Sequence, residues 1–344
     1  MATRKEVARL AGVAEATVSR VFSGTIPVST GKKEKVMEAA KQLGYFPNQV
    51  ASSLRRNSSK QILLLLADSD FQNPYFVDFY EGAIHCAESA GYLLSTSTDQ
   101  KFSTIRRRMY DGIILQNAAF SPNEVRENIR TPAVVYCSGE HPAYPWLENV
   151  TIDSALALEM MIYHLRAAGH TKIGLALPCH KMGIEAAQTA RYQRYVSLMN
   201  NVPGFNAESF IFEADAASLA ENIGEAVDYF HSGVIAAELV YQKKSDISAI
   251  VCFNDELALG LMWRLQSRGV RIPEDLSVGG IDGIRKGKYS IPPLTTIQLP
   301  SHQSGGECVR RLVGQIEGEK RESVNEEWQK YKIVSRESVR AIAT

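Results

Sequence analysis

The sequence predicts two kinds of structure in one chain: a small all-α head, then an α/β core of two doubly wound parallel-sheet lobes. The first observation is charge, because residues 1–60 carry a net +7 whereas the remaining residues carry −7. The second is a closely spaced series of helix signals within those basic residues. The third is an alternation of apolar strand patterns and helical patterns in the rest of the chain, which is typical of parallel sheets covered by helices.

The composition excludes several classes of protein. The chain has 344 residues, 45% of them hydrophobic and 22% charged, as in an ordinary globular protein. No apolar run reaches the ~18 residues that a membrane-spanning helix needs, and the first residues lack the apolar stretch of a secretory signal. The five cysteines are scattered and form no C-x-x-C pair. We therefore expect a cytoplasmic protein with reduced thiols.

The head is predicted to contain three helices. Thr3 and Glu6 have the spacing of a capping box, and Gly12 supplies the left-handed residue that ends the first helix. The apolar faces of the three helices are expected to be Val7, Leu10 and Ala11, then Val18, Val21 and Phe22, then Val36, Ala40 and Leu43. A second helix from Glu15 to about Phe22 follows so closely that the pair forms a helix-turn-helix. Ser29 is expected to cap the third helix, which Gly44 ends.

The second helix has the composition of a DNA-recognition helix. Its residues outside the apolar face are Glu15, Ala16, Thr17, Ser19 and Arg20. Small and hydroxyl side chains allow a helix to enter a major groove, and an arginine can bind guanine through two hydrogen bonds. A solvated helix face is the alternative. The +7 charge and the short turn favour DNA binding.

Residues 47–60 are predicted to form a short hinge helix and a linker. Pro47 suits the first turn of a helix, but two turns are too few to be stable alone. Leu54 followed by Arg55 and Arg56 resembles a minor-groove wedge, in which an apolar tip is flanked by phosphate-binding residues. A plain interdomain linker is the alternative.

The head resembles the lactose-repressor (LacI/GalR) family of transcription regulators. The similarity runs through Ala11-Gly12-Val13, Ala16-Thr17-Val18-Ser19-Arg20, Gly44-Tyr45, Pro47-Asn48 and Leu54. It implies a helix-turn-helix domain over residues 1–46 that binds a pseudo-palindromic operator in double-stranded DNA as a homodimer. The residues expected at the DNA are Thr3, Glu15, Ala16, Thr17, Ser19, Arg20 and Ser29, with Asn48, Ala51, Leu54 and Arg55 from the hinge.

In the core, Ile62–Ala67 is an apolar run typical of a strand buried on both faces. The other strand candidates are 92–95, 112–115, 133–136, 173–177, 250–253 and 277–281. Helical patterns lie between them, notably over 75–90, 155–168 and 256–267. This much α/β structure exceeds what one core usually holds, so we expect two lobes. Ligands of such sheets bind at the carboxyl ends of the strands, and the cleft between the lobes is the expected site.

The core resembles the effector-binding part of the same family, which is related to periplasmic sugar-binding proteins. Matching stretches include Asn73-Pro74-Tyr75-Phe76, Asp111-Gly112-Ile113-Ile114, Asn254-Asp255-Glu256 and Pro293-Leu294-Thr295-Thr296. The resemblance implies a periplasmic-binding-protein-like core in which the chain crosses between lobes three times. The first lobe is then expected over 61–153 with 294–322, and the second over 154–293 with 323–344.

Polar and aromatic residues follow the expected strand ends, as a polyol ligand requires. The resemblance implies that Arg191, Asp282 and one of the Asn254-Asp255 pair bind the effector. The full expected set is Tyr75, Phe76, Gln116, Arg191, Asn254, Asp255 and Asp282. Asp255 could instead be a helix cap, and Tyr75 and Phe76 could be core residues. Two of the departures from the family concern the expected ligand site: Gly283 stands where a second Asp or Asn is common, and Cys137 where some sugar-responsive relatives have a polar residue.

The expected function is a transcription regulator, most simply a repressor, controlled by a carbohydrate. A purine-type corepressor is the main alternative, and an activator or a solute-binding protein are weaker ones. The chain has no H-E-x-x-H, no P-loop, no G-x-S-x-G and no Cys/His metal spacing. We therefore expect no catalytic residue, metal or cofactor. Inducer versus corepressor, and dimer versus higher oligomer, are left open by the sequence.

Overall fold

The structure is a computed structural model that describes residues 2–23, 27–45, 58–66, 73–98, 109–116, 122–137, 146–178, 189–213, 228–319 and 328–342. The expected hinge residues Asn48, Ala51, Leu54 and Arg55 lie outside these ranges. The chain divides into two compact units, residues 1–59 and 60–344. Among the described residues, no helix is both long and apolar enough to span a membrane.

The head contains the three predicted helices, which are α1 (Arg4–Ala11), α2 (Glu15–Ser23) and α3 (Thr30–Gln42). The capping box of Thr3 and Glu6 is formed, and Gly12 ends α1 with a φ of 65°. Val7, Val18 and Val36, one from each helix, are fully buried in a common core. The predicted apolar faces were wrong at two positions, because Leu10 is 51% exposed and Leu43 is 37% exposed. Ala8 and Ala39 are buried instead, since three short helices meet along small residues.

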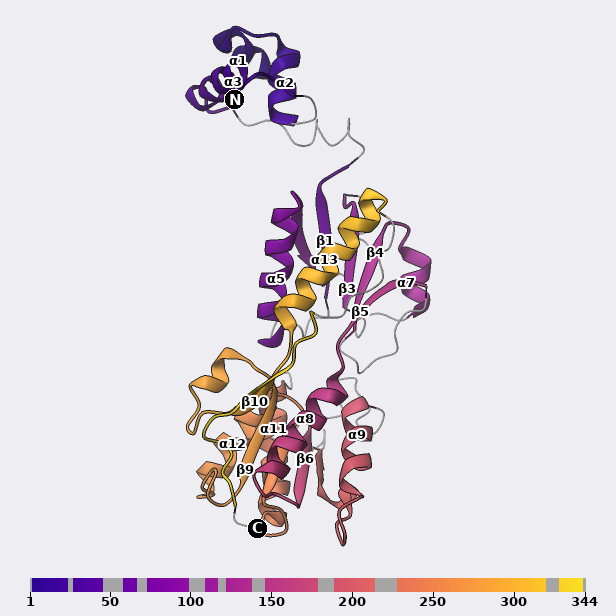
Figure 1. Ribbon diagram of the computed structural model, residues 1–344, viewed down its shortest axis with the longest axis vertical. Coiled ribbons are helices and arrows are strands. Elements are labelled where there is room, and N and C mark those ends of the chain that lie inside the picture. Colours follow the sequence, from indigo (N-terminus) through magenta and orange to yellow (C-terminus); the bar gives the residue numbers. More distant parts are fainter. Residues whose placement is uncertain are drawn as a thin grey trace. The chain divides into compact units, whose positions relative to one another are not determined.

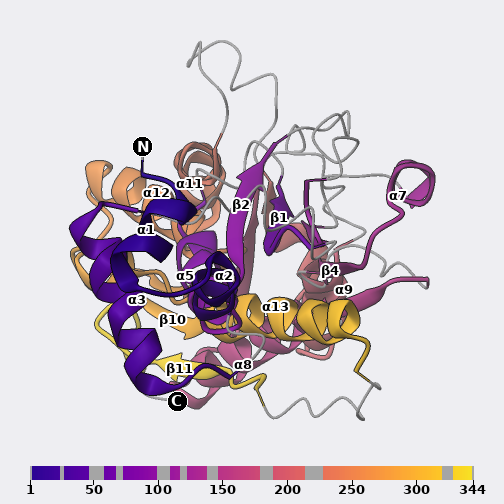
Figure 2. The same ribbon diagram turned by 90° about the horizontal axis from the view of Figure 1, so that it is seen from above.

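The first lobe of the core is a five-stranded parallel sheet in the order β2-β1-β3-β4-β5. Its strands are β1 (Gln61–Leu65), β2 (Leu93–Ser97), β3 (Gly112–Gln116), β4 (Ala133–Cys137) and β5 (Glu148–Thr151). Helices α5 (Tyr75–Ser89) and α13 (Ser301–Glu317) lie side by side on one face (Figures 1 and 2). Val125 of α7 (Pro122–Asn128) packs on the other face. The continuous apolar run at β1 is thus explained by helices on both sides of the sheet.

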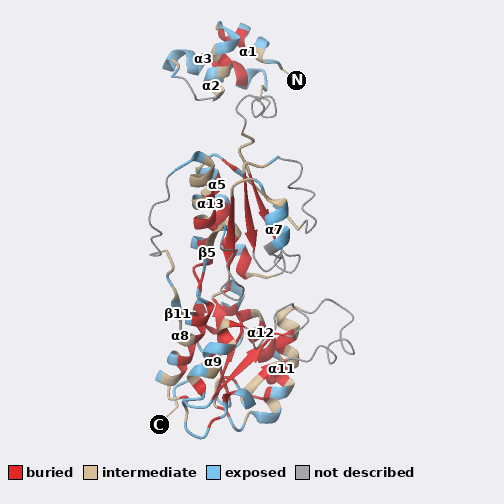
Figure 3. Cartoon of the chain, turned by 90° about the vertical axis from the view of Figure 1, so that its right-hand side faces the viewer, coloured by how far each residue is buried: buried red, intermediate tan, exposed pale blue. Residues whose placement is uncertain are grey.

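The second lobe is a six-stranded sheet in the order β11-β10-β9-β8-β6-β7, parallel except for β11. Its strands are β6 (Ile173–Leu177), β7 (Ile211–Glu213), β8 (Ala249–Cys252), β9 (Ser277–Asp282), β10 (Thr295–Gln298) and β11 (Lys332–Val334). Its helices are α8 (Ser154–Ala167), α9 (Ala190–Met199), α11 (Tyr229–Lys243) and α12 (Asp255–Ser267), with the short 3₁₀ turns η5 (Ala207–Phe210) and η6 (Arg285–Lys288). In both lobes the central strands are buried along their whole length (Figure 3).

The second crossing between the lobes falls later than the sequence suggested. The expected boundary lay between residues 293 and 294, but β10 pairs in parallel with β9 and so belongs to the second lobe. The chain returns to the first lobe only after Gln298, where α13 begins at Ser301. Strand pairing between distant segments decides this boundary, and the local pattern of Pro293-Leu294-Thr295 carries no signal of it.

The first and third crossings are hydrogen-bonded to each other. The backbone N–H of Asp153 donates to the Tyr331 hydroxyl over 2.6 Å, and the Gln329 side chain donates to the Thr151 carbonyl over 2.9 Å. Two segments almost 180 residues apart in the sequence therefore run together where the lobes join.

Candidate effector cleft and DNA-binding face

The second helix of the head exposes the residues that we expected at DNA. Glu15, Ala16 and Arg20 of α2 are exposed, and Thr17 and Ser19 are half-buried, whereas Val18 faces the core with no exposure. This arrangement follows from helical periodicity, because one buried position every three to four residues leaves the remaining side chains outside. The face carries one acidic group, Glu15, and Arg4 of α1 lies 3.4 Å from its carboxylate.

Thr3 and Ser29 precede helices, and both are exposed. The Thr3 hydroxyl accepts the N–H of Glu6 over 3.3 Å and donates to the Glu6 carboxylate over 2.9 Å. Ser29 occupies the position before α3, but its side chain forms no capping hydrogen bond. The backbone carbonyl of Ser29 instead accepts from Lys32 and Lys33. The Ser29 hydroxyl is thus not committed to the cap that the sequence suggested.

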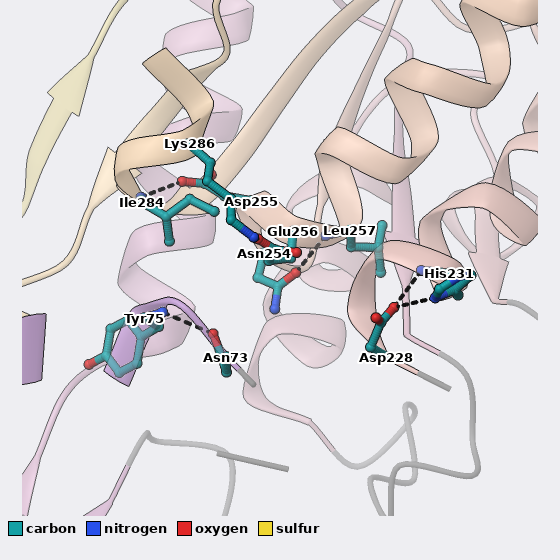
Figure 4. A network of polar contacts seen from close by, with 10 residues as sticks. All are labelled: Asn73, Tyr75, Asp228, His231, Asn254, Asp255, Glu256, Leu257, Ile284 and Lys286. Carbon is teal, nitrogen blue, oxygen red and sulfur yellow. Dashed lines mark hydrogen bonds and ion pairs between the residues drawn. The ribbon is translucent and has the colours of Figure 1, made fainter. Parts of the chain in front are cut away.

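Tyr75 and Phe76 begin α5 at the carboxyl end of the first sheet. They are 6% and 4% exposed. Asn73 accepts the N–H of Tyr75 over 3.0 Å and so orients the first turn (Figure 4). The Tyr75 hydroxyl forms a short hydrogen bond with the Tyr136 hydroxyl at the end of β4. Burial raises the pKa of the Tyr75 hydroxyl far above its usual value, so this group stays protonated.

Gln116 is the last residue of β3, and Tyr136 lies beside it in register on β4. Its side chain is 5% exposed, and its Oε1 has no hydrogen-bond partner among the described residues. Because a buried amide oxygen without a partner is costly, this atom is suited to accept a hydrogen bond from a ligand or a water molecule.

Arg191 belongs to the first turn of α9 and is 4% exposed. Its Nη1 donates to the Phe253 carbonyl over 2.5 Å, and its guanidinium lies 4.1 Å from the centre of the Phe253 ring. The Phe253 ring in turn stacks with the ring of Tyr229, at a distance of 6.1 Å between the ring centres. These contacts fix the arginine at the carboxyl end of β8. Phe253 directly precedes Asn254 but was not among the expected site residues.

Asn254 and Asp255 have different environments. Asn254 is the cap of α12, because its Oδ1 accepts the N–H of Leu257 over 2.9 Å (Figure 4). The cap uses its oxygen and leaves the amide NH₂ as a donor. Asp255 is fully buried and accepts three hydrogen bonds from the protein, two of them from the backbone of Gly283 and Ile284. Burial raises the pKa of Asp255 to about 6, although these hydrogen bonds lower it.

Asp282 ends β9 and is 8% exposed. Its φ of 125° is uncommon for a residue with a side chain, and such strain clusters at binding sites. Burial raises the pKa of Asp282 well above its usual value, and the positive charge of Arg191 opposes that rise. The charge of Asp282 raises the pKa of Tyr75, which belongs to the other lobe, and the charge of Arg191 lowers it. These three residues therefore lie near one another although they come from both sheets.

The two departures from the family have structural explanations. Gly283 has a φ of 78°, and a side chain there would place Cβ 2.7 Å from the Cα of Gln298, so an Asp does not fit without rearrangement. The Cys137 thiol is buried at the end of β4, where its sulfur lies 3.5 Å from the Asn149 side-chain oxygen. Burial raises the pKa of this thiol to about 11, so it stays neutral.

Comparisons with known proteins agree with this arrangement. Residues 3–48 match the family described as bacterial regulatory proteins, lacI family, and residues 162–339 match the periplasmic binding protein-like domain. The HTH-type transcriptional repressor PurR of Vibrio cholerae serotype O1 (strain M66-2) is 32% identical over 338 residues, 94% of each chain. The ribose operon repressor of Haemophilus influenzae is 31% identical over 328 residues, 92% of each chain.

Among solved structures, the lac repressor dimer bound to operator and the anti-inducer ONPF has a similar fold. The TM-score is 0.75 with 21% sequence identity, and the alignment covers 99% of each chain. The similarity to this structure shows the fold. Membership of the family is shown by the sequence identity of more than 30% to the two repressors above. The chain belongs to the lacI family of bacterial regulatory proteins and is a DNA-binding transcriptional regulator with an effector-binding core.

Proposed function

We propose that this regulator is a repressor whose affinity for its operator is controlled by a small neutral molecule, a sugar or sugar derivative, bound between the core lobes. The observation that carries the proposal is that Arg191 and Asp282 lie close enough to Tyr75 of the other lobe to shift its pKa, while the Phe76 ring lies 5.2 Å from the Tyr75 ring. One positive and one negative group suit a ligand without net charge. The amide of Asn254 and the Oε1 of Gln116 add a donor and an acceptor for hydroxyls.

A purine base is the second candidate effector. The aromatic start of α5 could stack on a planar ring, and the Vibrio cholerae relative is named PurR, as are relatives from several other Vibrio species. The Haemophilus influenzae relative is instead named a ribose operon repressor, a name that agrees with a sugar. In either case the ligand must bind two arrangements of the lobes with different affinity, because only differential binding shifts their populations. We further propose that the protein acts in the cytoplasm and does not turn its ligand over.

A thermal-shift screen of the full chain tests the effector class. The panel contains ribose, other neutral mono- and disaccharides, a sugar phosphate, hypoxanthine and guanine. A ligand at ~100 times its Kd stabilises the folded protein by about 2.7 kcal/mol, enough to raise the melting temperature by several degrees. We expect a neutral sugar to produce the shift and the sugar phosphate to produce none.

Variants of the cleft assign the shift to this site. Arg191→Leu removes the buried guanidinium, and we expect it to abolish the stabilisation by the active compound. Arg194→Leu, three residues along α9, is the matched control, because Arg194 pairs with Glu159 on the surface. A shift from purines alone would replace the sugar by a base, and a shift that survives Arg191→Leu would contradict the assigned cleft.

We also propose that the regulator binds a pseudo-palindromic operator as a homodimer through an apolar surface of the second lobe. A groove of about 490 Å³ between α12 and the segment after η6 is lined by apolar side chains that include Phe230 and Met262. Trp263, Tyr289 and Ile291 also line the groove and project from it, since they are 57%, 76% and 84% exposed. A projecting apolar group next to an apolar groove can pair with its own copy about a two-fold axis. A second copy of this chain is supported as the partner by the solved lac repressor, which is described as a dimer bound to its operator.

The variant Ile291→Glu tests the dimer surface. A charge buried at an interface without a partner costs several kcal/mol, so we expect monomers at micromolar concentration in sedimentation velocity. Tyr163→Glu on α8 is the control, because Tyr163 is 50% exposed but lies outside the groove. Sedimentation of Ile291→Glu as a dimer, with Tyr163→Glu behaving alike, would reject this surface.

A further inference from the structure

A buried carboxylate holds the turn that follows the cleft residue Asp282. Oδ2 of Asp255 accepts the backbone N–H of Ile284 over 2.9 Å (Figure 4). The same oxygen accepts the N–H of Gly283 over 2.9 Å, and Oδ1 accepts the Thr296 hydroxyl over 2.6 Å. Gly280 lies so close that a Cβ there would be 2.1 Å from the same carboxylate. The turn is therefore tied to the start of α12 and has little freedom to move independently.

The far end of this turn contacts the other lobe. Arg285 directly follows Ile284, and its Nη2 lies 3.0 Å from Oδ1 of Asp78 and 2.9 Å from Oε2 of Glu81. Both carboxylates belong to α5, whose first residue is Tyr75. Within four residues the chain thus passes from a cleft carboxylate of the second lobe, Asp282, to an ion pair with the helix that carries the aromatic wall of the first lobe.

We propose that Arg285 is an interlobe positioning residue, whose ion pair with Asp78 and Glu81 favours the arrangement of the lobes in which Asp282 and Tyr75 face one ligand. Asp255 fixes the turn, so the position of Asp282 and that of Arg285 change together. This role of the ion pair adds to the proposed control by an effector, and the expected effect on ligand affinity rests on that proposed function.

The exposure of the groups determines how large the effect is. The side chain of Arg285 is 72% exposed, that of Asp78 28% and that of Glu81 44%. Ion pairs this exposed contribute modestly and are screened by salt. We expect the loss of the pair to weaken ligand binding by roughly two- to five-fold. The diagnostic property is salt dependence, because a neutral ligand has no charge of its own for salt to screen.

The experiment compares the full chain with Arg285→Gln and Arg271→Gln. Arg271 is the matched control, because its side chain is 70% exposed and pairs with Asp275 inside the second lobe. The Kd of ribose, or of guanine if ribose does not bind, is measured by calorimetry at 0.05 and 0.5 M NaCl. We expect the Kd of the wild type to rise about two- to five-fold with salt, and that of Arg285→Gln to be raised already at low salt and then constant. Arg271→Gln should behave like the wild type.

A ligand-free measurement keeps the proposal independent of the effector. Hydrogen exchange of the full chain reports the opening of α5 and of the segment 283–288. We expect faster exchange in both segments for Arg285→Gln at 0.05 M NaCl, and restoration in the charge-swapped chain Arg285→Glu with Glu81→Arg. The proposal is overturned if Arg285→Gln leaves exchange in α5 unchanged, or if its salt dependence equals that of the wild type. Failure of every probe to bind, with the exchange result as expected, would count against the proposed effector class and support the interlobe contact.

Discussion

Removal of residues 1–59 is expected to abolish recognition of the operator and to leave the core intact. The head and the core are separate compact units, each with its own buried cluster, and the expected base-contacting residues all belong to the head or hinge. Specific binding exceeds nonspecific binding by ~10³-fold or more, so the loss should be at least that large. The full chain first selects its operator from a random duplex library, and residues 60–344 are then titrated with the selected duplex.

Two controls accompany the truncation. The melting temperature of residues 60–344, and its rise with the active compound, should match those of the core in the full chain. Arg20→Ala in the full chain should reduce operator affinity by about 1–3 kcal/mol, because it removes one side chain of the exposed face of α2. Specific binding by the truncated chain would contradict the assignment of DNA recognition to the head.

Gly305→Ala is expected to destabilise the core strongly. Helices α5 and α13 approach so closely that a Cβ on Gly305 would lie 2.0 Å from the backbone carbonyl oxygen of Phe79, and one on Gly82 would lie 1.9 Å from that of His302. Backbone atoms cannot give way as a flexible side chain does, so the helices must separate. We expect a loss of about 3 kcal/mol, which lowers the melting temperature by roughly 6–12 °C.

The neighbouring glycine provides the control. A Cβ on Gly306 would lie 3.6 Å from the Gly82 carbonyl oxygen, which is an ordinary contact. Since alanine favours a helix over glycine by up to ~1 kcal/mol, Gly306→Ala should be neutral or stabilising. Calorimetric melting of the two variants measures the difference. Equal melting temperatures would show that the close helix approach is not required for the stability of the core.

The same close approach occurs in the second lobe. A Cβ on Gly233 of α11 would lie 2.0 Å from the Leu257 carbonyl oxygen, and one on Gly260 of α12 would lie 2.0 Å from that of Phe230. In each lobe, a helix that begins at the candidate cleft is thus seated by glycines against a partner helix. The helix starts at Tyr75 and Asp255 are therefore held in place by close packing between helices.

The sequence by itself determined the parts that depend on neighbours within a few residues. The capping box at Thr3, the turn at Gly12 and the buried strand at Ile62 are local signals, and the structure confirms each of them. Residues at the carboxyl ends of strands, such as Gln116 and Asp282, could also be named in advance. A parallel sheet brings its strand ends to one edge, so position along the chain predicts position in the fold.

Only the tertiary structure decided the features that join distant segments. The pairing of β10 with β9 decides to which lobe β10 belongs, and the packing of the three head helices decides that Leu10 is exposed. One partner of Asp255 is Thr296, 41 residues away, and Arg285 reaches Asp78 across 207 residues. An Asp or Glu looks the same in the sequence whether its carboxylate binds a ligand, holds a turn or forms an ion pair with the other lobe. What distinguishes these roles is which donors folding brings within 3 Å of its oxygens, and no local pattern encodes that distance.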